Sequence, residues 1–473
     1  EGPVCYAAVC LAGEAGLRVG EVKGLRWRED VDLVAGTITE EAQTPLAHVN
    51  VAAHARGTPN LALADAGTDE RVKPLLGKLV RFEVKSGEFT LSEATLKDAE
   101  AFWETQQRPR YVPEHDDAFE GLPGFADIGF SGSSVIGVKA ANLAELSHVV
   151  PDVAPPAGFA VPFHYYNEYM QSYHPTAADC DAARVDCAEE GRATLVCDGA
   201  GARCQAGVTA NSSLWEHADR LLADEGLATD APAREAALDG LAYLIGHGTI
   251  DPAFGEALNA RVGDIVGDGK VRLRSSTNSE DLPNFSGAGL YESFSATATG
   301  EKAASIRVRE VWASVWRWRA HEERTFWNID HREVRMGVAV HRSYPDEAAN
   351  GVLLTQNIVD PLTAGMYVNV QKGEVSVTNP EGGEVAEAFS IVPSPTGAVQ
   401  IATRRWSSLS PDAALLSQAE VKALYAAALK IQYHFAPLYD VDPFALILDM
   451  EFKFHGPERT LVIKQVRPYA ESR

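Results

Sequence analysis

The pattern of apolar and polar positions divides this chain into a short first part and a longer second part. In the first part, residues 36–39 and 79–84 form short apolar runs that predict strands on either side of a segment of small residues. Such an arrangement predicts a compact α/β unit. A charged, helix-like stretch follows and ends at residues 108–113, where two prolines break the pattern and predict a linker.

The second part alternates helix-like and strand-like patterns. Helical spacing predicts a helix at 139–146 and one continuous amphipathic helix at 308–327, with Trp312, Trp316 and Phe326 available for burial. The remaining expected elements are strands at 336–341, 351–356 and 375–378, a helix at 418–435, and a hairpin that pairs 444–454 with 460–466. A chain of 473 residues exceeds the usual size of a single core, so we expect two or three domains of α/β and α+β structure.

The composition is that of an ordinary globular protein with a strongly acidic balance. Hydrophobic residues make up 45% and charged residues 23%, and the formal net charge is -24. This charge argues against a general nucleic-acid or anionic-membrane surface, so any anion site must be local. No apolar run approaches the ~20 residues of a membrane-spanning helix. Glu1 in place of Met predicts a fragment or a processed product.

A segment at about residues 177–210, rich in Ala, Asp and Gly, carries four of the six cysteines. They are Cys180, Cys187, Cys197 and Cys204. The segment has little periodic apolar pattern, which is typical of an insertion. Because the spacing lacks the short pairs of zinc sites, two local disulfides are favoured, with a zinc site or free thiols as the alternatives.

The segment at residues 271–294 combines a basic strand, a hydroxyl cluster, an acidic pair and a glycine loop. Arg274 can hold phosphate oxygens with its planar guanidinium, and Ser275 begins a run of three hydroxyl side chains. Gly287 and Gly289 lack a Cβ, so backbone N–H groups there can approach an anion closely. The combination indicates a polyphosphate site. The alternative is a surface hairpin with a salt bridge.

The closing hairpin is predicted to have one polar face. Alternation along its strands places Glu451 on the same face as Gln465 and Arg467. A carboxylate and an amide oxygen are suitable ligands for Mg²⁺, whose shell is commonly completed by phosphate oxygens and water. The alternative is a cross-strand Glu/Arg pair on a solvated face.

Lys139 follows Gly137 at the start of a predicted helix. At a helix N-terminus, a cation and free backbone N–H groups can hold a phosphate together. A solvated surface lysine is the alternative for this position.

These motifs, in this order, resemble those of the nucleotide-binding domain of the pyruvate phosphate dikinase and phosphoenolpyruvate synthase family, whose fold is related to ATP-grasp enzymes. The resemblance covers most of residues 129–468. It is carried by residues 137–143, by residues 271–283, and by residues 449–451 together with 465–468.

The resemblance also implies roles for particular residues. ATP and Mg²⁺ would be the cofactors. Lys139 and Arg274 would bind ATP phosphates, and Glu451 and Gln465 would bind magnesium. Arg467 would assist phosphoryl transfer. Gly287 and Gly289 would belong to a mobile loop over the triphosphate.

Residues 43–60 resemble the swivelling phosphohistidine domain of the same family. His48 matches the phosphorylated histidine, whose neutral imidazole can attack phosphorus, whereas His54 does not match and is expected to be structural. The histidine domain comes first here, as in glucan water dikinases. The resemblance therefore implies a β/β/α histidine domain at residues 1–95, truncated at its start, a linker at 96–120, and an ATP-grasp-like domain at 121–473.

The implied function is that of an ATP-dependent dikinase-type phosphotransferase that passes a phosphoryl group through His48 to a pyruvate-like or carbohydrate acceptor. Val138 replaces a family glycine, and a family loop is reduced to Gly382-Gly383-Glu384. The alternative is therefore a nucleotide-binding regulatory or scaffold module without transfer activity. ATP use favours the cytosol, whereas disulfides would favour an extracytoplasmic location. We expect no nucleic-acid partner and no membrane segment, and the sequence leaves the oligomeric state open.

Overall fold

The computed structural model describes most of the chain. The described residues are 4–8, 36–40, 53, 57–85, 88–105, 108–155, 158–176, 178–179, 182, 212–280, 287, 289–360, 362–377, 384–394 and 398–469. His48 and the four clustered cysteines lie outside these ranges. The phosphohistidine and disulfide assignments therefore stay predictions.

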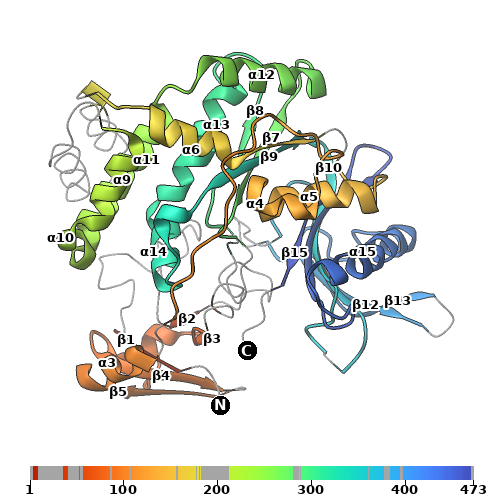
Figure 1. Cartoon of the computed structure of the whole chain (residues 1–473). Helices are drawn as coiled ribbons and strands as arrows, with labels where there is room; N and C mark the ends of the chain where they lie inside the picture. The colour runs from red at the N-terminus through yellow and green to blue at the C-terminus, as the bar shows by residue number, and fades with distance from the viewer. Residues whose placement is uncertain are drawn as a thin grey trace.

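The first part of the chain forms a small antiparallel sheet with the strand order β1-β4-β5. Its strands are β1 Val4–Ala8, β4 Leu79–Lys85 and β5 Glu88–Glu93, and helix α3 Leu96–Thr105 follows. A short parallel pair, β2 Thr37–Thr39 and β3 Asn60–Ala62, lies in the same part of the chain. The two strands predicted here are confirmed, and this α/β unit lies at the bottom of Figure 1.

The segment after α3 runs along the larger part of the molecule (Figure 1). The backbone N–H of Tyr111 donates to the carbonyl of Asn328, and the N–H of Asp330 donates to the carbonyl of Tyr111, both at 2.9 Å. The Arg108 guanidinium lies 3.9 Å from the centroid of the Trp327 ring. The predicted linker region is thus docked against a helix of the second part.

A four-stranded antiparallel sheet with a layer of helices forms the first half of the larger part. The strand order is β6-β9-β7-β8, with β6 Phe159–Val161, β7 Val271–Thr277, β8 Phe294–Ala296 and β9 Met336–Arg342. The helices are α6 Phe163–Ser172, α9 Leu214–Ala223, α10 Glu225–Thr229, α11 Ala231–His247, α12 Pro252–Val266, α13 Ala304–Ala313 and α14 Trp318–Phe326.

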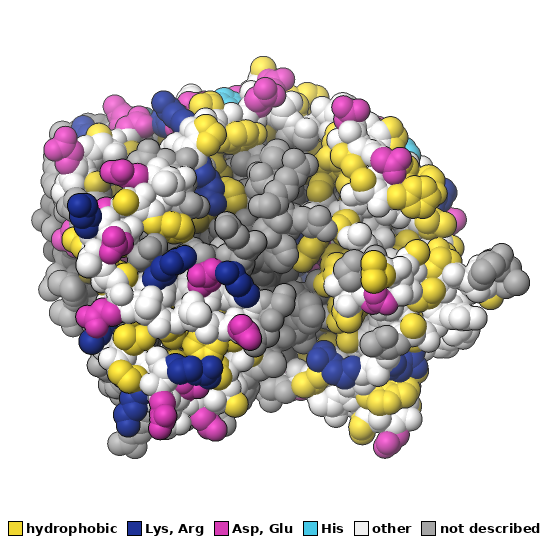
Figure 2. All heavy atoms as spheres, turned by 90° about the horizontal axis from the view of Figure 1, so that it is seen from below, with side chains coloured by type: hydrophobic (Ala, Val, Ile, Leu, Met, Phe, Trp, Pro, Cys, Tyr) yellow, Lys and Arg dark blue, Asp and Glu magenta, His cyan; other side chains and the backbone are white. Residues whose placement is uncertain are grey.

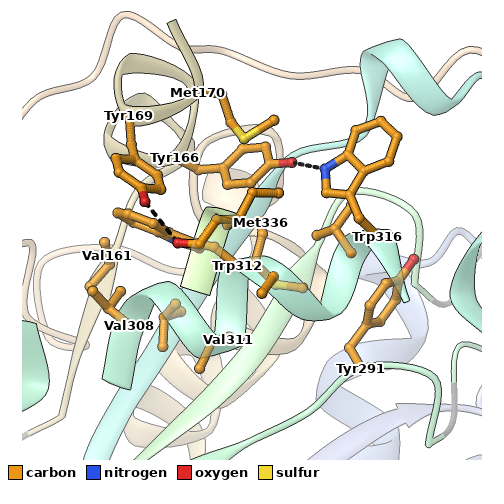
Figure 3. Packing of buried hydrophobic residues seen from close by; sticks show 14 of the residues in the cluster. Val161, Tyr166, Tyr169, Met170, Tyr291, Val308, Val311, Trp312, Trp316 and Met336 are labelled. Atoms are coloured by element: carbon orange, nitrogen blue, oxygen red, sulfur yellow. Dashed lines mark hydrogen bonds between the residues drawn. The ribbon is translucent and has the colours of Figure 1, made fainter. Parts of the chain in front are cut away.

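Aromatic side chains fill the core between this sheet and its helices (Figure 3). Trp316 Nε1 donates to the Tyr166 hydroxyl at 3.0 Å, and the Tyr169 hydroxyl donates to the Ile245 carbonyl at 2.7 Å. These bonds satisfy the polar atoms of side chains that are otherwise surrounded by apolar groups. The core therefore holds β7 and β9 rigidly from one side.

A six-stranded antiparallel sheet forms the other half, with the order β13-β12-β11-β10-β14-β15. Its strands are β10 Glu347–Leu354, β11 Met366–Lys372, β12 Glu387–Pro393, β13 Val399–Arg405, β14 Leu448–His455 and β15 Thr460–Pro468. Helices α4 Ser133–Ile136, α5 Val138–Val149 and α15 Gln418–Leu438 share a core with one face of it. In Figure 1, α5 and α15 lie beside β15.

Side chains of β14 alternate between that core and the opposite face of the sheet. Met450, Phe452 and Phe454 are fully buried in the core shared with α5 and α15. Because neighbouring side chains of a strand point to opposite faces, Glu451 and Lys453 lie on the other face. That face carries the polar residues that the hairpin was predicted to present.

Two of the predicted elements are wrong. Residues 308–327 do not form one helix: α13 is followed by a short 3₁₀ turn, η4 Ser314–Trp316, and by Arg317 in an extended conformation before α14 begins. The break changes the buried face, so Trp312 and Trp316 are fully buried, whereas Phe326 is 41% exposed. Residues 375–377 are not a strand, because β11 ends at Lys372 and its partner strand β12 begins at Glu387.

Charges of both signs are mixed on the face of the molecule that Figure 2 shows from below. Lys and Arg side chains lie there among Asp and Glu side chains, so this face carries no general anion-binding surface. Within the described ranges, no helix is long and apolar enough to cross a membrane.

Candidate functional site

The N-terminus of α5 lies directly on strand β7 because residue 137 is a glycine. Gly137 has φ +83°, and a Cβ built there would lie 2.2 Å from the carbonyl oxygen of Ser276. The backbone N–H of Ala140 donates to Ser276 Oγ at 2.8 Å, which satisfies one of the free N–H groups of the helix end. This close packing holds Lys139 over the hydroxyl run of β7.

Lys139 is held by two groups of the segment predicted to bind phosphate. Its Nζ donates to Glu280 Oε1 at 2.8 Å and to Ser275 Oγ at 3.3 Å. The side chains of Lys139 and Glu280 are only 13% and 3% exposed. The solvated-surface alternative for Lys139 is therefore wrong. Since an ammonium group has three donors, one remains for a ligand.

Glu280 was not singled out in the sequence, although it belongs to the acidic pair of the 271–294 segment. Its Oε2 also accepts a hydrogen bond from the backbone N–H of Thr277 at 3.1 Å. The backbone at Gly287 packs against it so closely that a Cβ there would lie 2.6 Å from Glu280 Cγ. Glu280 thus connects Lys139, the end of β7 and the glycine loop.

Replacement of Glu280 by glutamine is expected to lower the free energy of unfolding by about 2 kcal/mol or more, because it leaves the nearly buried Lys139 ammonium without its counter-charge. Urea unfolding measures this. The matched control is Glu93→Gln. Glu93 and its partner Lys78 form an exposed ion pair, so the effect of this replacement should be much smaller. Equal effects of the two replacements would contradict the role of Glu280 as a buried counter-ion.

Gly289 has φ +71°, a conformation that favours glycine, and the N–H of Leu290 donates to the carbonyl of Gly287 at 3.2 Å. The two glycines therefore lie in one tight turn. The mobility predicted for the loop remains a prediction, since residues 281–286 and 288 lie outside the described ranges.

Arg274 connects the two sheets. Its NH1 donates to the backbone carbonyl of Lys464 at 3.0 Å, and its NH2 donates to Glu451 Oε2 at 3.3 Å and to Gln465 Oε1. The guanidinium of β7 thus reaches β14 and β15 at once. Although β7 and β8 do pair as a hairpin, the mostly buried β7 makes the surface-hairpin alternative wrong.

The last hairpin places Glu451 and Gln465 on one face, as predicted. Glu451 lies opposite Gln465, and Asp449 lies opposite Arg467. Arg467 donates through Nε at 2.9 Å and NH2 at 2.6 Å to one oxygen, Asp449 Oδ2. Both side chains are largely buried, at 11% and 12% exposed, so the predicted alternative of a Glu/Arg pair on a solvated face is wrong.

Lys464 is a site residue that the sequence reasoning missed. The pairing passes from Glu451–Gln465 to Phe452–Ile463, so Lys464 is the extra residue of a β-bulge. Its Nζ lies 3.2 Å from Glu451 Oε2. Ile463 lies in the core and Gln465 lies opposite Glu451, so the bulge leaves Lys464 and Gln465 together opposite Glu451. A lysine inside an otherwise apolar run was the available signal for the bulge.

The cations keep Glu451 ionised. Burial raises the pKa of this carboxyl, but Lys464, Arg274 and Arg467 together lower it further, so the net pKa lies below the usual range. Burial raises the pKa of Asp449, against the opposing effect of Arg467. The second oxygen of Asp449, Oδ1, is buried and has no hydrogen-bond partner.

The oxygen donors here fit a magnesium ion whose coordination shell is completed mainly by phosphate oxygens and water. Glu451 supplies a charged carboxylate and Gln465 an amide oxygen at opposed positions, and the unpartnered Asp449 Oδ1 lies on the neighbouring pair. No group of three or more His, Cys, Asp or Glu side chains suited to a metal occurs in the described part of the chain. Mg²⁺ commonly takes one or two protein groups and otherwise phosphate oxygens and water.

The predicted site residues are thus brought together in one contact series. Lys139 contacts Ser275, the neighbouring Arg274 contacts Glu451 and Gln465, and Arg467 lies two residues further along β15. His48 lies outside the described residues and is not placed.

Comparison with known proteins identifies the family of the chain. The family described as "Pyruvate phosphate dikinase, AMP/ATP-binding domain" matches residues 133–473. The phosphoenolpyruvate synthase of Aeropyrum pernix is 27% identical over 257 residues, which are 44% of this chain and 30% of that protein. A rifampicin phosphotransferase of a Streptomyces species is 28% identical over 241 residues, 50% of this chain and 22% of that protein.

The phosphoenolpyruvate synthase of Pyrococcus furiosus is 32% identical over 103 residues, 22% of this chain and 12% of that protein. The chain thus spans less than a third of the length of these curated relatives. The family match nevertheless covers most of the chain, including Lys139, Arg274 and the closing hairpin. We conclude that this chain belongs to the pyruvate phosphate dikinase family through its AMP/ATP-binding domain.

Proposed function

We propose that the protein is an ATP-dependent dikinase-type phosphotransferase, in which a phosphoryl group passes from ATP through a phosphohistidine at His48 to a pyruvate-like or carbohydrate acceptor. The observation that carries the proposal is the contact series from Lys139 through Ser275 and Arg274 to Glu451 and Gln465. These groups come from two sheets and converge on one place, as a ligand with several charged oxygens requires.

Phosphoryl transfer depends mainly on positioning and on preorganised positive charge. Lys139 and Arg274 supply two largely buried cations, and the register pair Glu451/Gln465 would hold Mg²⁺. When bound, Mg²⁺ neutralises charge on the phosphate oxygens. Arg467, fixed by Asp449, would face the phosphate that is transferred. All these roles are proposals supported by the geometry.

The domain assignment belongs to the same proposal. Residues 1–95 would be a swivelling histidine domain, 96–120 its linker, and 121–473 an ATP-grasp-like nucleotide domain. In the proposed step, a bond forms between a ring nitrogen of His48 and the β-phosphorus while the bond from that phosphorus to AMP breaks. The γ-phosphoryl group passes to water or inorganic phosphate, and the phosphohistidine then serves the acceptor.

Incubation with ATP labelled at the β-phosphate is expected to leave acid-labile label on the protein and to release AMP. His48→Ala should abolish the label, because it removes the nucleophile. His54→Ala is the matched control, since it removes a neighbouring imidazole outside the motif, and it should retain the label. Label that persists in His48→Ala would exclude His48 as the acceptor.

A nucleotide-binding regulatory or scaffold module is the second candidate. Val138 at the start of α5 favours it, since this residue replaces a family glycine beside Lys139. The internal pairing of Lys139, Arg274 and Arg467 with carboxylates also favours it. ATP binding without AMP release, tested with pyruvate and with a glucan as acceptors, would support this candidate over a transferase.

A further inference from the structure

Lys464 lies at an irregularity in the backbone of the candidate site. A β-bulge between the Glu451–Gln465 and Phe452–Ile463 pairs leaves both Lys464 and Gln465 opposite Glu451. The backbone carbonyl of Lys464 accepts a hydrogen bond from Arg274 NH1, and its Nζ lies 3.2 Å from Glu451 Oε2. Backbone and side chain of one residue thus contact both halves of the site.

This part of the site has more positive charge than its carboxylates balance. Arg274 NH2 and Lys464 Nζ approach the same oxygen, Glu451 Oε2, at 3.3 and 3.2 Å. Lys453, on the same face of β14, is paired with Glu347. Two cations therefore depend on one carboxylate at Glu451, and the Lys464 side chain is only 23% exposed.

The surroundings of Lys464 favour an additional anion. The Lys464 side chain is only 23% exposed, and it shares the single carboxylate oxygen Glu451 Oε2 with Arg274. Largely buried positive charges that repel one another are stabilised by an anion that binds between them. Ionised phosphate groups would supply this charge, while Glu451 would be engaged by the metal.

We infer that Lys464 is a further phosphate-binding residue of this site, which holds Glu451 in the free chain and binds triphosphate oxygens when a magnesium–nucleotide complex is present. This inference rests on the proposed ATP-dependent function. It adds a third cation to Lys139 and Arg274, and it gives the bulge a role, which is to place Lys464 and Gln465 together opposite Glu451.

The test is equilibrium binding of MgATP and of AMP by titration calorimetry, with wild type and Lys464→Met. We expect the affinity for MgATP to fall at least about tenfold, as for loss of one hydrogen bond to a charged group, and the affinity for AMP to change less than about twofold. Lys464→Arg should restore most of the MgATP affinity because it keeps the charge.

Lys372→Met is the matched control, because it removes the same charge from an exposed strand end of the same sheet, and it should bind as wild type does. Thermal unfolding checks that each variant folds, and Lys464→Gln replaces the methionine variant if that one does not. Unchanged MgATP affinity, or equal losses for MgATP and AMP, would overturn the inference alone. A wild type that binds no MgATP would overturn the proposed nucleotide function and this inference with it.

Discussion

Replacement of Arg274 by lysine is expected to lower the affinity for MgATP by about 100-fold, although the positive charge is kept. Arg274 holds the Lys464 carbonyl with NH1 and the side chains of Glu451 and Gln465 with NH2. The single ammonium of lysine cannot span three acceptors on two strands, and it cannot hold phosphate oxygens bidentately. Binding of MgATP to the purified variant measures the effect.

The matched control for this exchange is Arg342→Lys on the neighbouring strand β9. Arg342 is exposed, and its NH2 donates to the Ile265 carbonyl at 3.0 Å, so its replacement should leave MgATP binding unchanged. Gln465 and Glu451 lose their Arg274 contact in the first variant, so its unfolding is measured as well. If Arg274→Lys folds and binds MgATP within about twofold of wild type, Arg274 is not a bidentate phosphate ligand.

Replacement of Gly137 by alanine is expected to destabilise the protein by about 2–6 kcal/mol. The conformation at Gly137, with φ +83° and ψ 157°, is one that residues with a Cβ avoid, at a cost of about 1–3 kcal/mol. The new Cβ would also meet the Ser276 carbonyl oxygen at 2.2 Å, which adds about 1–3 kcal/mol for the displaced backbone. Urea unfolding measures the total.

Gly267→Ala separates the two contributions. Gly267 also has a positive φ, +55°, but a Cβ there has nothing within 4 Å. Its replacement should therefore show only the conformational strain. If both variants lose the same free energy of unfolding, the close approach between α5 and β7 does not contribute. A larger loss for Gly137→Ala, together with weakened MgATP binding, would show that this contact also positions Lys139.

Much of the site could be predicted because its residues lie in short segments with strong local patterns. Apolar alternation predicted the strand that carries Arg274 and the facing positions of Glu451 and Gln465. The period of a strand is two residues, so alternation places Gln465 and Arg467 on the same face of their strand. The helix that begins beside Lys139 was predicted in the same way.

Partners that are distant in the chain could not be predicted in this way. The sequence reasoning did not assign Glu280 to Lys139, or Asp449 to Arg467, although every one of these residues lies in a recognised motif. Ion pairs depend on which side chains the fold brings within about 4 Å, and a motif contains no information on that distance. For the same reason, the alternatives of a solvated lysine and a solvated ion pair could be excluded only once the structure showed that these side chains are buried.

Two irregularities show a different limit. The break at Arg317 divides a segment whose helical period is nearly continuous, and the bulge at Lys464 shifts the alternation of β15 by one residue. The spacing of apolar residues along the chain does not reveal a single residue that shifts which side chains face the core.

The amino-acid sequence by itself determined the order of the motifs and the class of the chain, and it marked Lys139, Arg274, Glu451, Gln465 and Arg467 as candidate site residues. These features depend on residue type and local spacing. The tertiary structure alone decided that Arg274 of one sheet meets the closing hairpin of another, that Glu280 neutralises Lys139, and that Lys464 faces the site. These features depend on how close two distant segments lie, which is set by the packing of both sheets against their helices.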